Sequence, residues 1–157
     1  SWAAQLKKLG LAYTNTEGDI AVLGKLGNLT KATLTKATSI SMARTSVTGD
    51  IAVLGNLTKA TQIDMSGTEV TGDIAVLGKC PGLVNADLSH CRKITGDISV
   101  LGSLTEATEI NMKLTGVTGD IKVFEHTKGL KEVNSATEVT GDIAVLGNLT
   151  ESTSISM

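Results

Sequence analysis

The chain has 157 residues, a formal net charge of −2 and an apolar share of 41%, but only 2% of its residues are aromatic. This charge disfavours a general nucleic-acid-binding protein, which needs a concentrated basic surface to neutralise phosphates. Apolar runs of the Ile-Ala-Val-Leu kind are too short for a transmembrane helix of about 20 residues. The two cysteines are too few for a disulfide framework. The N-terminus, where Lys7 and Lys8 follow a short apolar stretch, does not resemble a signal peptide.

One motif, Thr-Gly-Asp-Ile-Ala-Val-Leu-Gly at 71–78, recurs along most of the chain. Successive Gly-Asp-Ile copies lie 31, 23, 24, 23 and 22 residues apart and begin at Gly18, Gly49, Gly72, Gly96, Gly119 and Gly141. A period in the low twenties is typical of a solenoid, in which each coil packs on its neighbours. The longer first step contains Leu-Thr-Lys-Ala-Thr twice, at 29–33 and 34–38, which indicates a bulge from one coil. We therefore predict that residues 1–157 form a single repeat domain of about seven coils, the last one incomplete.

A short strand is predicted in each coil, because apolar residues alternate there with polar ones. After Leu6, the alternating apolar positions are Leu9 and Leu11, Ile40 and Met42, Ile63 and Met65, Ala86 and Leu88, Ile110 and Met112, then Val133, and finally Ile155 in the incomplete last coil. A threonine follows in most coils, at Thr14, Thr45, Thr68, Thr115 and Thr137, and Cys91 takes its place once. We expect this column to be internal, with each hydroxyl bonded to the backbone of a neighbouring coil.

A one-turn helix is predicted where Asp precedes Ile-Ala-Val-Leu and Gly follows it. The Asp can accept hydrogen bonds from the free N–H groups at the helix start, and the Gly can adopt the left-handed conformation at the end. The aspartates are Asp19, Asp50, Asp73, Asp97, Asp120 and Asp142. A ladder of cation ligands is the alternative, but calcium-binding solenoids use Gly-rich nonapeptides that this chain lacks.

The run from Leu57 to Ile74 resembles the leucine-rich repeat pattern LxxLxxLxLxxNxLxGxI, in the plant-type variant that continues with LGxL. Leu-Gly-Asn-Leu-Thr at 54–58 and 146–150 matches that continuation directly. The repeat TGDIxVLGxLxxxTxIxM, with Thr where the family usually has Asn, is most similar to long repeat proteins of unicellular algae such as dinoflagellates. The resemblance implies an α/β solenoid: a leucine-rich repeat arc with a parallel β-sheet on the concave face and short helical turns or loops on the convex face.

The resemblance also implies that the concave face is the binding surface. Its residues would be the strand side chains that point away from the core: Gln62, Asp64, Ser66, Asn85, Asp87, Ser89, Glu109, Asn111, Lys113, Glu132 and Asn134. The carboxylates among them make the middle mildly acidic, which favours a basic partner or a cation; a solvated polar face without a ligand is the alternative. Tyr13 and Arg44 are the only large side chains near the first coils, so we expect no aromatic cluster of the kind that anchors tight interfaces.

The position two residues after each motif Ile is always Val, at Val22, Val53, Val76, Val100, Val123 and Val145. One interpretation is that this Val is partly buried beneath the convex turn. The other is an exposed association stripe of Val53, Val76, Val100 and Val123, because contiguous apolar patches seldom face water without use.

No enzyme is predicted. His90 and His126 lie in different coils, neither Cys80 nor Cys91 has a partner at a zinc-ligand spacing, and the phosphate-loop motif is absent. We therefore predict no catalytic residue, no cofactor and no metal. Asn-Leu-Thr sequons at Asn28, Asn56 and Asn148 are formal glycosylation acceptors, but they arise from the repetition of one segment.

Neither terminus shows the polar cap that solenoids generally have, and open strand edges at Leu6–Leu11 and Ile155–Met157 would be templates for association. The first hypothesis is a non-catalytic interaction or scaffold module that binds protein partners through its concave face and ends. The alternative is a structural protein that self-assembles into filaments or tubes, or a peripheral subunit of a large complex. A third hypothesis, an ice- or sugar-binding surface, rests on the many threonines, but most of them fall in turns or interior positions.

Overall fold

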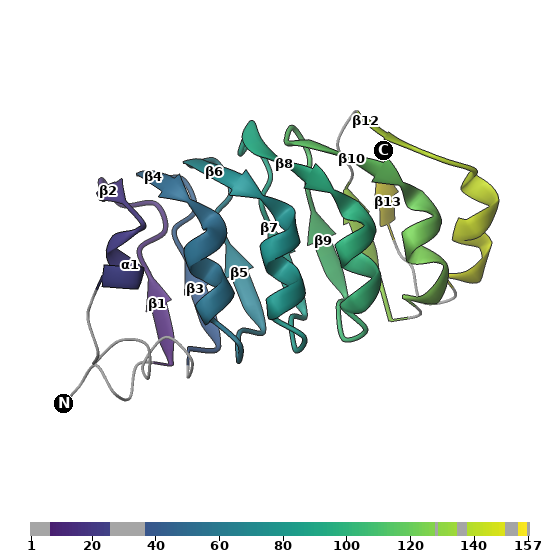
Figure 1. The fold of residues 1–157 in the computed structure, drawn as a ribbon, viewed down its shortest axis with the longest axis horizontal. Coiled ribbons are helices and arrows are strands. Elements are labelled where there is room, and N and C mark those ends of the chain that lie inside the picture. Colours follow the sequence, from purple (N-terminus) through teal and green to yellow (C-terminus); the bar gives the residue numbers. More distant parts are fainter. Residues whose placement is uncertain (1–6, 26–36, 128, 135–137, 150–153, 157) are drawn as a thin grey trace.

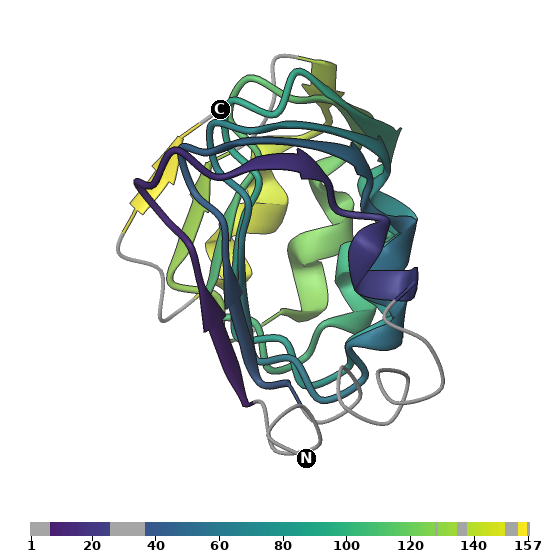
Figure 2. The same cartoon turned by 90° about the vertical axis from the view of Figure 1, so that its left-hand side faces the viewer.

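The computed structural model describes residues 7–25, 37–127, 129–134, 138–149 and 154–156. Successive coils contribute, in turn, a strand to a first sheet, a strand to a second sheet and a short helix (Figure 1). Seen along the stack, the two sheets and the row of helices enclose one interior (Figure 2). The predicted solenoid is therefore confirmed.

The first sheet, called the A sheet here, is parallel and has seven strands in the order β1-β3-β5-β7-β9-β11-β13. Its strands are β1 (Lys8–Gly10), β3 (Ser39–Ser41), β5 (Gln62–Asp64), β7 (Asn85–Asp87), β9 (Glu109–Asn111), β11 (Glu132–Asn134) and β13 (Ser154–Ser156). From β3 to β11 the middle residue is buried and its two neighbours face away from the core. Identical repeat positions pair in register, as Ile63 does with Ala86 and Asp64 with Asp87.

A second parallel sheet, called the B sheet, was not predicted. Its six strands lie in the order β12-β10-β8-β6-β4-β2. They are β2 (Glu17–Asp19), β4 (Ser46–Asp50), β6 (Glu69–Asp73), β8 (Lys93–Asp97), β10 (Gly116–Asp120) and β12 (Glu138–Thr140). Here the register is displaced: Thr48 pairs with Glu69, and Asp50 pairs with Thr71. Each outward Thr thus lies beside residues from other positions of the repeat.

The helices follow the B strands and are mostly 3₁₀ helices. They are α1 (Val22–Lys25), η2 (Ile51–Asn56), η3 (Ile74–Lys79), η4 (Ile98–Ser103), η5 (Ile121–His126) and η6 (Ile143–Asn148). The predicted aspartate caps are confirmed: Asp50 Oδ1, for example, accepts the N–H of Ala52 at 2.7 Å. None of the helices in the described segments is long and apolar enough to span a membrane.

The predicted glycine C-cap is wrong. Helix η2 continues past Gly55, and its C-cap is Leu57, whose φ is −86° and whose N–H donates to the Leu54 carbonyl. Gly55 and its equivalent Gly78 lie inside their helices and have no positive φ. A 3₁₀ helix ends on hydrogen bonds between residues three apart, so it does not need a left-handed residue to stop.

The core is almost entirely aliphatic, and in the described chain Phe124 is its one aromatic side chain. Thr45, Thr68 and Thr115 are buried as predicted. Their hydroxyls, however, donate to carbonyls three residues earlier in the same coil, at 2.6–2.7 Å, and not to the backbone of a neighbouring coil. Cys91 does reach the preceding coil, with Sγ 3.0 Å from the Met65 carbonyl oxygen.

The first coil departs from this pattern. Thr14 is exposed there, contrary to the prediction, because no earlier described coil covers it. Thr137 lies outside the described residues.

Candidate functional site

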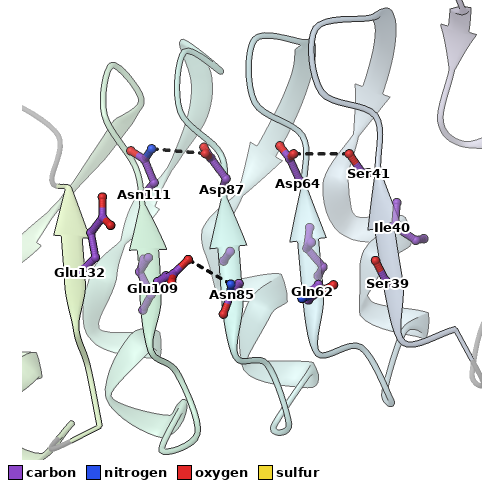
Figure 3. Close-up of a pocket in the computed structure, with 13 residues that line it drawn as sticks. Ser39, Ile40, Ser41, Gln62, Asp64, Asn85, Asp87, Glu109, Asn111 and Glu132 are labelled. Carbon is purple, nitrogen blue, oxygen red and sulfur yellow. Dashed lines mark hydrogen bonds between the residues drawn. The ribbon is translucent and has the colours of Figure 1, made fainter. Parts of the chain in front are cut away.

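The outward face of the A sheet forms a shallow hollow of about 340 Å³ (Figure 3). Seven of the eleven side chains predicted for the concave face line it: Gln62, Asp64, Asn85, Asp87, Glu109, Asn111 and Glu132. Asn134, also predicted, ends β11 in register with Asn111. Parallel pairing without displacement brings these side chains together, because each repeat position forms a straight column across the coils.

Two pairs of carboxylates lie directly opposite each other on neighbouring strands. Asp64 on β5 faces Asp87 on β7, and Glu109 on β9 faces Glu132 on β11. Like charges in this position are destabilising. The acidic character expected from the sequence is therefore concentrated at two points of the sheet.

Each aspartate of the first pair is held by its own turn. Asp64 Oδ1 accepts the Ser66 N–H at 3.0 Å and the Ser66 hydroxyl at 2.8 Å. Asp87 Oδ1 accepts the Ser89 N–H at 2.8 Å. The other oxygens have long contacts, 3.3 Å from Asp64 Oδ2 to Ser41 Oγ and 3.3 Å from Asp87 Oδ2 to Asn111 Nδ2 (Figure 3). Both carboxylates are thus oriented while keeping acceptor capacity.

The glutamates are oriented by amide side chains. Asn85 Nδ2 donates to Glu109 Oε2 at 3.0 Å across the strands. Asn134 Nδ2 donates to Glu132 Oε1 at 2.8 Å within β11. These bonds satisfy one oxygen of each glutamate but leave its charge uncompensated.

A second feature, which the sequence did not predict, lies where the A strands end. After each of the strands β1, β3, β5, β7 and β9, one residue has a left-handed backbone, and only one of the five is a glycine: Tyr13 (φ 58°), Arg44 (φ 53°), Gly67 (φ 67°), His90 (φ 63°) and Leu114 (φ 59°). We call these five residues the left-handed column. Glycine is the residue that usually indicates this conformation in a sequence. Because four of the five positions are not glycine, the sequence did not predict it.

The left-handed column borders a polar hollow of about 430 Å³, lined by Tyr13, Arg44, Asp64, Ser66, Gly67, Asp87, Ser89 and His90. Tyr13 is 77% exposed. The Arg44 guanidinium lies over its ring, 5.7 Å from the centroid. Tyrosine and arginine are enriched among residues that dominate binding energy, so this edge extends the candidate site beyond the A strands.

The predicted valine stripe lies between coils. Val76 is buried, and Val53, Val100 and Val123 are half-buried against the core. A Cβ atom at Gly78 would lie 2.7 Å from Val100 Cγ2. The valines therefore fit the interpretation of partial burial beneath the convex turn, and a role in association stays a prediction.

The residues considered for catalysis lie in different environments, and the side chain of His126 is outside the part of the chain that the structure describes. His90 belongs to the left-handed column, whereas Cys80 and Cys91 are buried, and burial raises the pKa of both thiols. No group of three or more His, Cys, Asp or Glu side chains within the described residues could hold a metal ion. Of the sequons, Asn28 lies outside the described residues, and Asn56 Nδ2 donates to the Val53 carbonyl at 3.1 Å.

Comparison with known proteins agrees with the geometry at the level of fold. No family model and no curated protein matches the chain. Among solved structures, internalin C2 from Listeria monocytogenes has a TM-score of 0.70 and 19% identity over 96% of this chain and 60% of its own. A plant ice-binding protein has a TM-score of 0.77 and 23% identity, covering 97% and 48%.

The leucine-rich repeat ectodomain of the Arabidopsis receptor kinase HAESA, in complex with a peptide hormone ligand, has a TM-score of 0.75 and 19% identity, covering 96% and 25%. The chain therefore has the leucine-rich repeat fold. It spans between 25% and 60% of the lengths of these three chains. The resemblance to algal repeat proteins stays a prediction.

Proposed function

We propose that the chain is a non-catalytic protein-interaction module that binds a basic segment of a partner protein through its concave face. The observation that carries this proposal is the pairing of Asp64 with Asp87 and of Glu109 with Glu132 across neighbouring strands. None of the A strands from β3 to β11 contains a Lys or Arg. A cationic side chain placed over each pair would relieve the repulsion within it.

The fold supports a role in binding without specifying a partner. The HAESA ectodomain, which shares the fold, was solved with a peptide hormone ligand. Fold alone does not carry function, so the proposal depends on the acidic pairs of this chain.

The spacing of the two pairs defines the partner further. Their centres are two strands apart across the sheet and two residues apart along it, which places them roughly 12 Å from each other. An extended peptide covers that distance in about four residues. The fitting partner is therefore an extended segment with two lysines or arginines at this spacing.

The test uses a capped fluorescent peptide with two lysines separated by three alanines, measured by fluorescence anisotropy. Asp64→Asn combined with Asp87→Asn removes one charge pair but keeps the oxygen that accepts the Ser66 and Ser89 N–H groups. We expect binding to weaken about tenfold. Binding to the unchanged protein should also weaken as salt is added, because the contacts are exposed.

The matched control is Glu106→Gln combined with Glu138→Gln, which changes the net charge equally with exposed residues outside the A sheet. It should bind the peptide as the unchanged protein does. Equal weakening in both double variants would mean that net charge alone attracts the peptide, and the proposal would then be wrong.

End-to-end association of copies is a second candidate, favoured by apolar surface at both described ends. An open hollow of about 340 Å³ beside β1, β2 and α1 is lined largely by Leu9, Leu11, Ile20 and Leu23. In the last helix, Ile143 is 66% exposed. Stacking one such end on the other would continue both parallel sheets.

Light scattering after size separation, over a range of concentrations, tests this association. Growth in mass that Ile143→Ser suppresses would support it. A monomer mass that does not change with concentration would contradict it.

The outward threonines of the B sheet do not favour an ice- or sugar-binding surface. The displaced register places Thr48 beside Glu69 and Thr71 beside Asp50. Charged side chains interrupt any regular hydroxyl array there, and the similarity to a plant ice-binding protein concerns the fold alone.

A further inference from the structure

The polar hollow beside the left-handed column contains opposite charges that do not pair with each other. Arg44, Asp64 and Asp87 all line it. Among the described residues, Arg44 forms no ion pair with either aspartate; the ion pair that is present joins Lys93 to Glu69. Within the same residues, Arg44 makes no side-chain hydrogen bond and stacks only on Tyr13. A guanidinium fork and two carboxylates are therefore available in one hollow.

The groups around the hollow are held in place before any ligand arrives. The aspartates are fixed by the Ser66 and Ser89 N–H groups. The backbone of Arg44 is fixed, because its N–H donates to the Ser66 carbonyl at 2.7 Å, and its guanidinium lies over the Tyr13 ring. Preorganised groups lose little freedom on binding, so a complementary ligand would gain more affinity from each contact.

Gly67 keeps the hollow open. It stands between Arg44 and His90 in the left-handed column and is the one glycine there. A Cβ atom at this position would lie 3.5 Å from Arg44 Cγ, so any larger side chain would extend into the space beside the arginine. The absence of a side chain at position 67 thus leaves the space beside Arg44 accessible.

We propose that this hollow binds a ligand that carries a carboxylate and an ammonium group together, with the carboxylate on Arg44 and the ammonium on Asp64 and Asp87. The ligand is either a small free amino acid or an acidic and a basic side chain of one peptide. A purely basic ligand would leave Arg44 uncompensated, and a purely acidic one would meet the aspartates. The inference rests on one part of the proposed function, the use of Asp64 and Asp87 as cation-binding groups, because these aspartates line both hollows.

Two arms of one experiment distinguish the two sources. The first titrates the protein with unbranched amino acids in which the amine and carboxylate are separated by increasing chain length. The second uses end-capped peptides with one Lys and one Glu at increasing separation, and peptides with only the Lys or only the Glu. Amide shifts of Ser66, Gly67 and Ser89 in NMR spectra locate the binding, and calorimetry gives the affinity.

We expect a doubly charged probe in at least one arm to bind about tenfold more tightly than the singly charged peptides. Arg44→Gln should remove that advantage, and Gly67→Asn should do the same by filling the space beside Arg44, since Asn tolerates a left-handed backbone. Arg92→Gln is the matched control, because Arg92 is exposed on the same edge but does not line the hollow. It should leave the affinity unchanged.

The outcomes separate this inference from the proposed function. If the Lys peptide binds through Asp64 and Asp87 but the doubly charged probes gain nothing, the concave-face proposal stands and this inference is overturned. An advantage that survives Arg44→Gln also overturns it. If the doubly charged probes alone bind, and lose affinity with Arg44→Gln, the inference stands and the basic-segment proposal fails.

Discussion

At the scale of single residues, one aspartate oxygen connects two coils. Asp50 Oδ1 accepts the Ala52 N–H at 2.7 Å and also lies against Gly72 of the next coil, where a Cβ atom would overlap it. Gly72 itself has a φ of 119°, a conformation that is essentially limited to glycine. Glycine and aspartate therefore recur together, because the aspartate side chain of one coil occupies the space that a side chain at the glycine of the next coil would need.

Gly72→Ala should consequently destabilise the protein by about 1–3 kcal/mol or more, since it adds backbone strain to a steric clash. Denaturant unfolding followed by circular dichroism measures the change. Gly82→Ala is the control, because Gly82 has no positive φ and a Cβ atom there would lie 4.0 Å from the Ala60 carbonyl oxygen. A comparable loss in both variants would show that the Asp50 contact is unimportant.

Asp97 links capping to pH. Hydrogen bonds from Ser99 lower the pKa of the Asp97 carboxyl below its ordinary value of 3.8. The backbone N–H of Ser99 has the larger effect, and its hydroxyl has the smaller one. The folded pKa is depressed, so this stabilisation is present above the ordinary value and is lost as pH falls through the folded value. Asp97→Asn keeps a capping oxygen but cannot titrate.

We expect the melting temperature of Asp97→Asn to fall less than that of the unchanged protein between about pH 5 and about pH 2.5. Thermal melts at several pH values measure this. Glu106→Gln, at an exposed position, should not alter the acid profile. An identical fall in Asp97→Asn would mean that the cap does not depend on ionisation.

At the scale of elements, neighbouring helices pack a valine of one coil over a glycine of the coil before it. The distance from a Cβ atom at Gly78 to Val100 Cγ2 would be 2.7 Å, and at Gly102 to Val123 Cγ2 it would be 3.0 Å. The missing side chain at these glycines leaves space for the valine of the next coil. The glycines do not end the helices. The close approach lets the helices follow the spacing that the two sheets impose.

Gly78→Ala should destabilise the protein by about 1–3 kcal/mol through overpacking, although Gly→Ala at a compatible position usually stabilises. Adding Val100→Ala should recover part of the loss, so that a double-mutant cycle gives a coupling of about 0.5–3 kcal/mol. Gly147→Ala is the matched control, because nothing lies within 4 Å of its Cβ position; it should be neutral or stabilising. Strict additivity at 78 and 100 would contradict the packing argument.

The sequence predicted the A sheet, the helices and the aspartate caps, because each has a pattern of residue types that recurs in every repeat. It did not predict the B sheet. Strands such as Glu69–Asp73 contain glycine and aspartate, which are depleted in strands, and their hydrogen bonds go to the next coil. Seven of the predicted concave residues line the hollow, but the left-handed column at Tyr13, Arg44 and His90 gave no signal in residue type.

At the scale of the whole molecule, stability depends on contacts between adjacent coils. Interior coils contact a neighbour on both sides, whereas the first and last described coils have one described neighbour. In such one-dimensional arrays the stability is approximately a sum of repeat and interface terms. Local opening should therefore be easier at the described ends than in the middle.

Amide hydrogen exchange should show stronger protection in β5 to β8 than in β1, β2 and β12. Leu77→Ala, at a fully buried position, should cost about 2–5 kcal/mol and weaken protection in the central coils. Leu146→Ala, the same repeat position in η6 but half-buried, should cost less and affect only its own end. Uniform protection, with equal effects of both variants, would indicate that the molecule unfolds as one cooperative unit.

The coupling of glycine and aspartate between coils also affects how such an array can change length. Each coil supplies the glycine that its predecessor's aspartate needs and the aspartate that its successor's glycine accommodates, as Gly72 and Asp73 do between Asp50 and Gly96. In the same way, the helix glycine of one coil leaves space for the valine of the next coil, as Gly78 does for Val100. A whole unit can therefore be copied or removed in frame with every junction still complementary, so the number of units can vary without compensating substitutions.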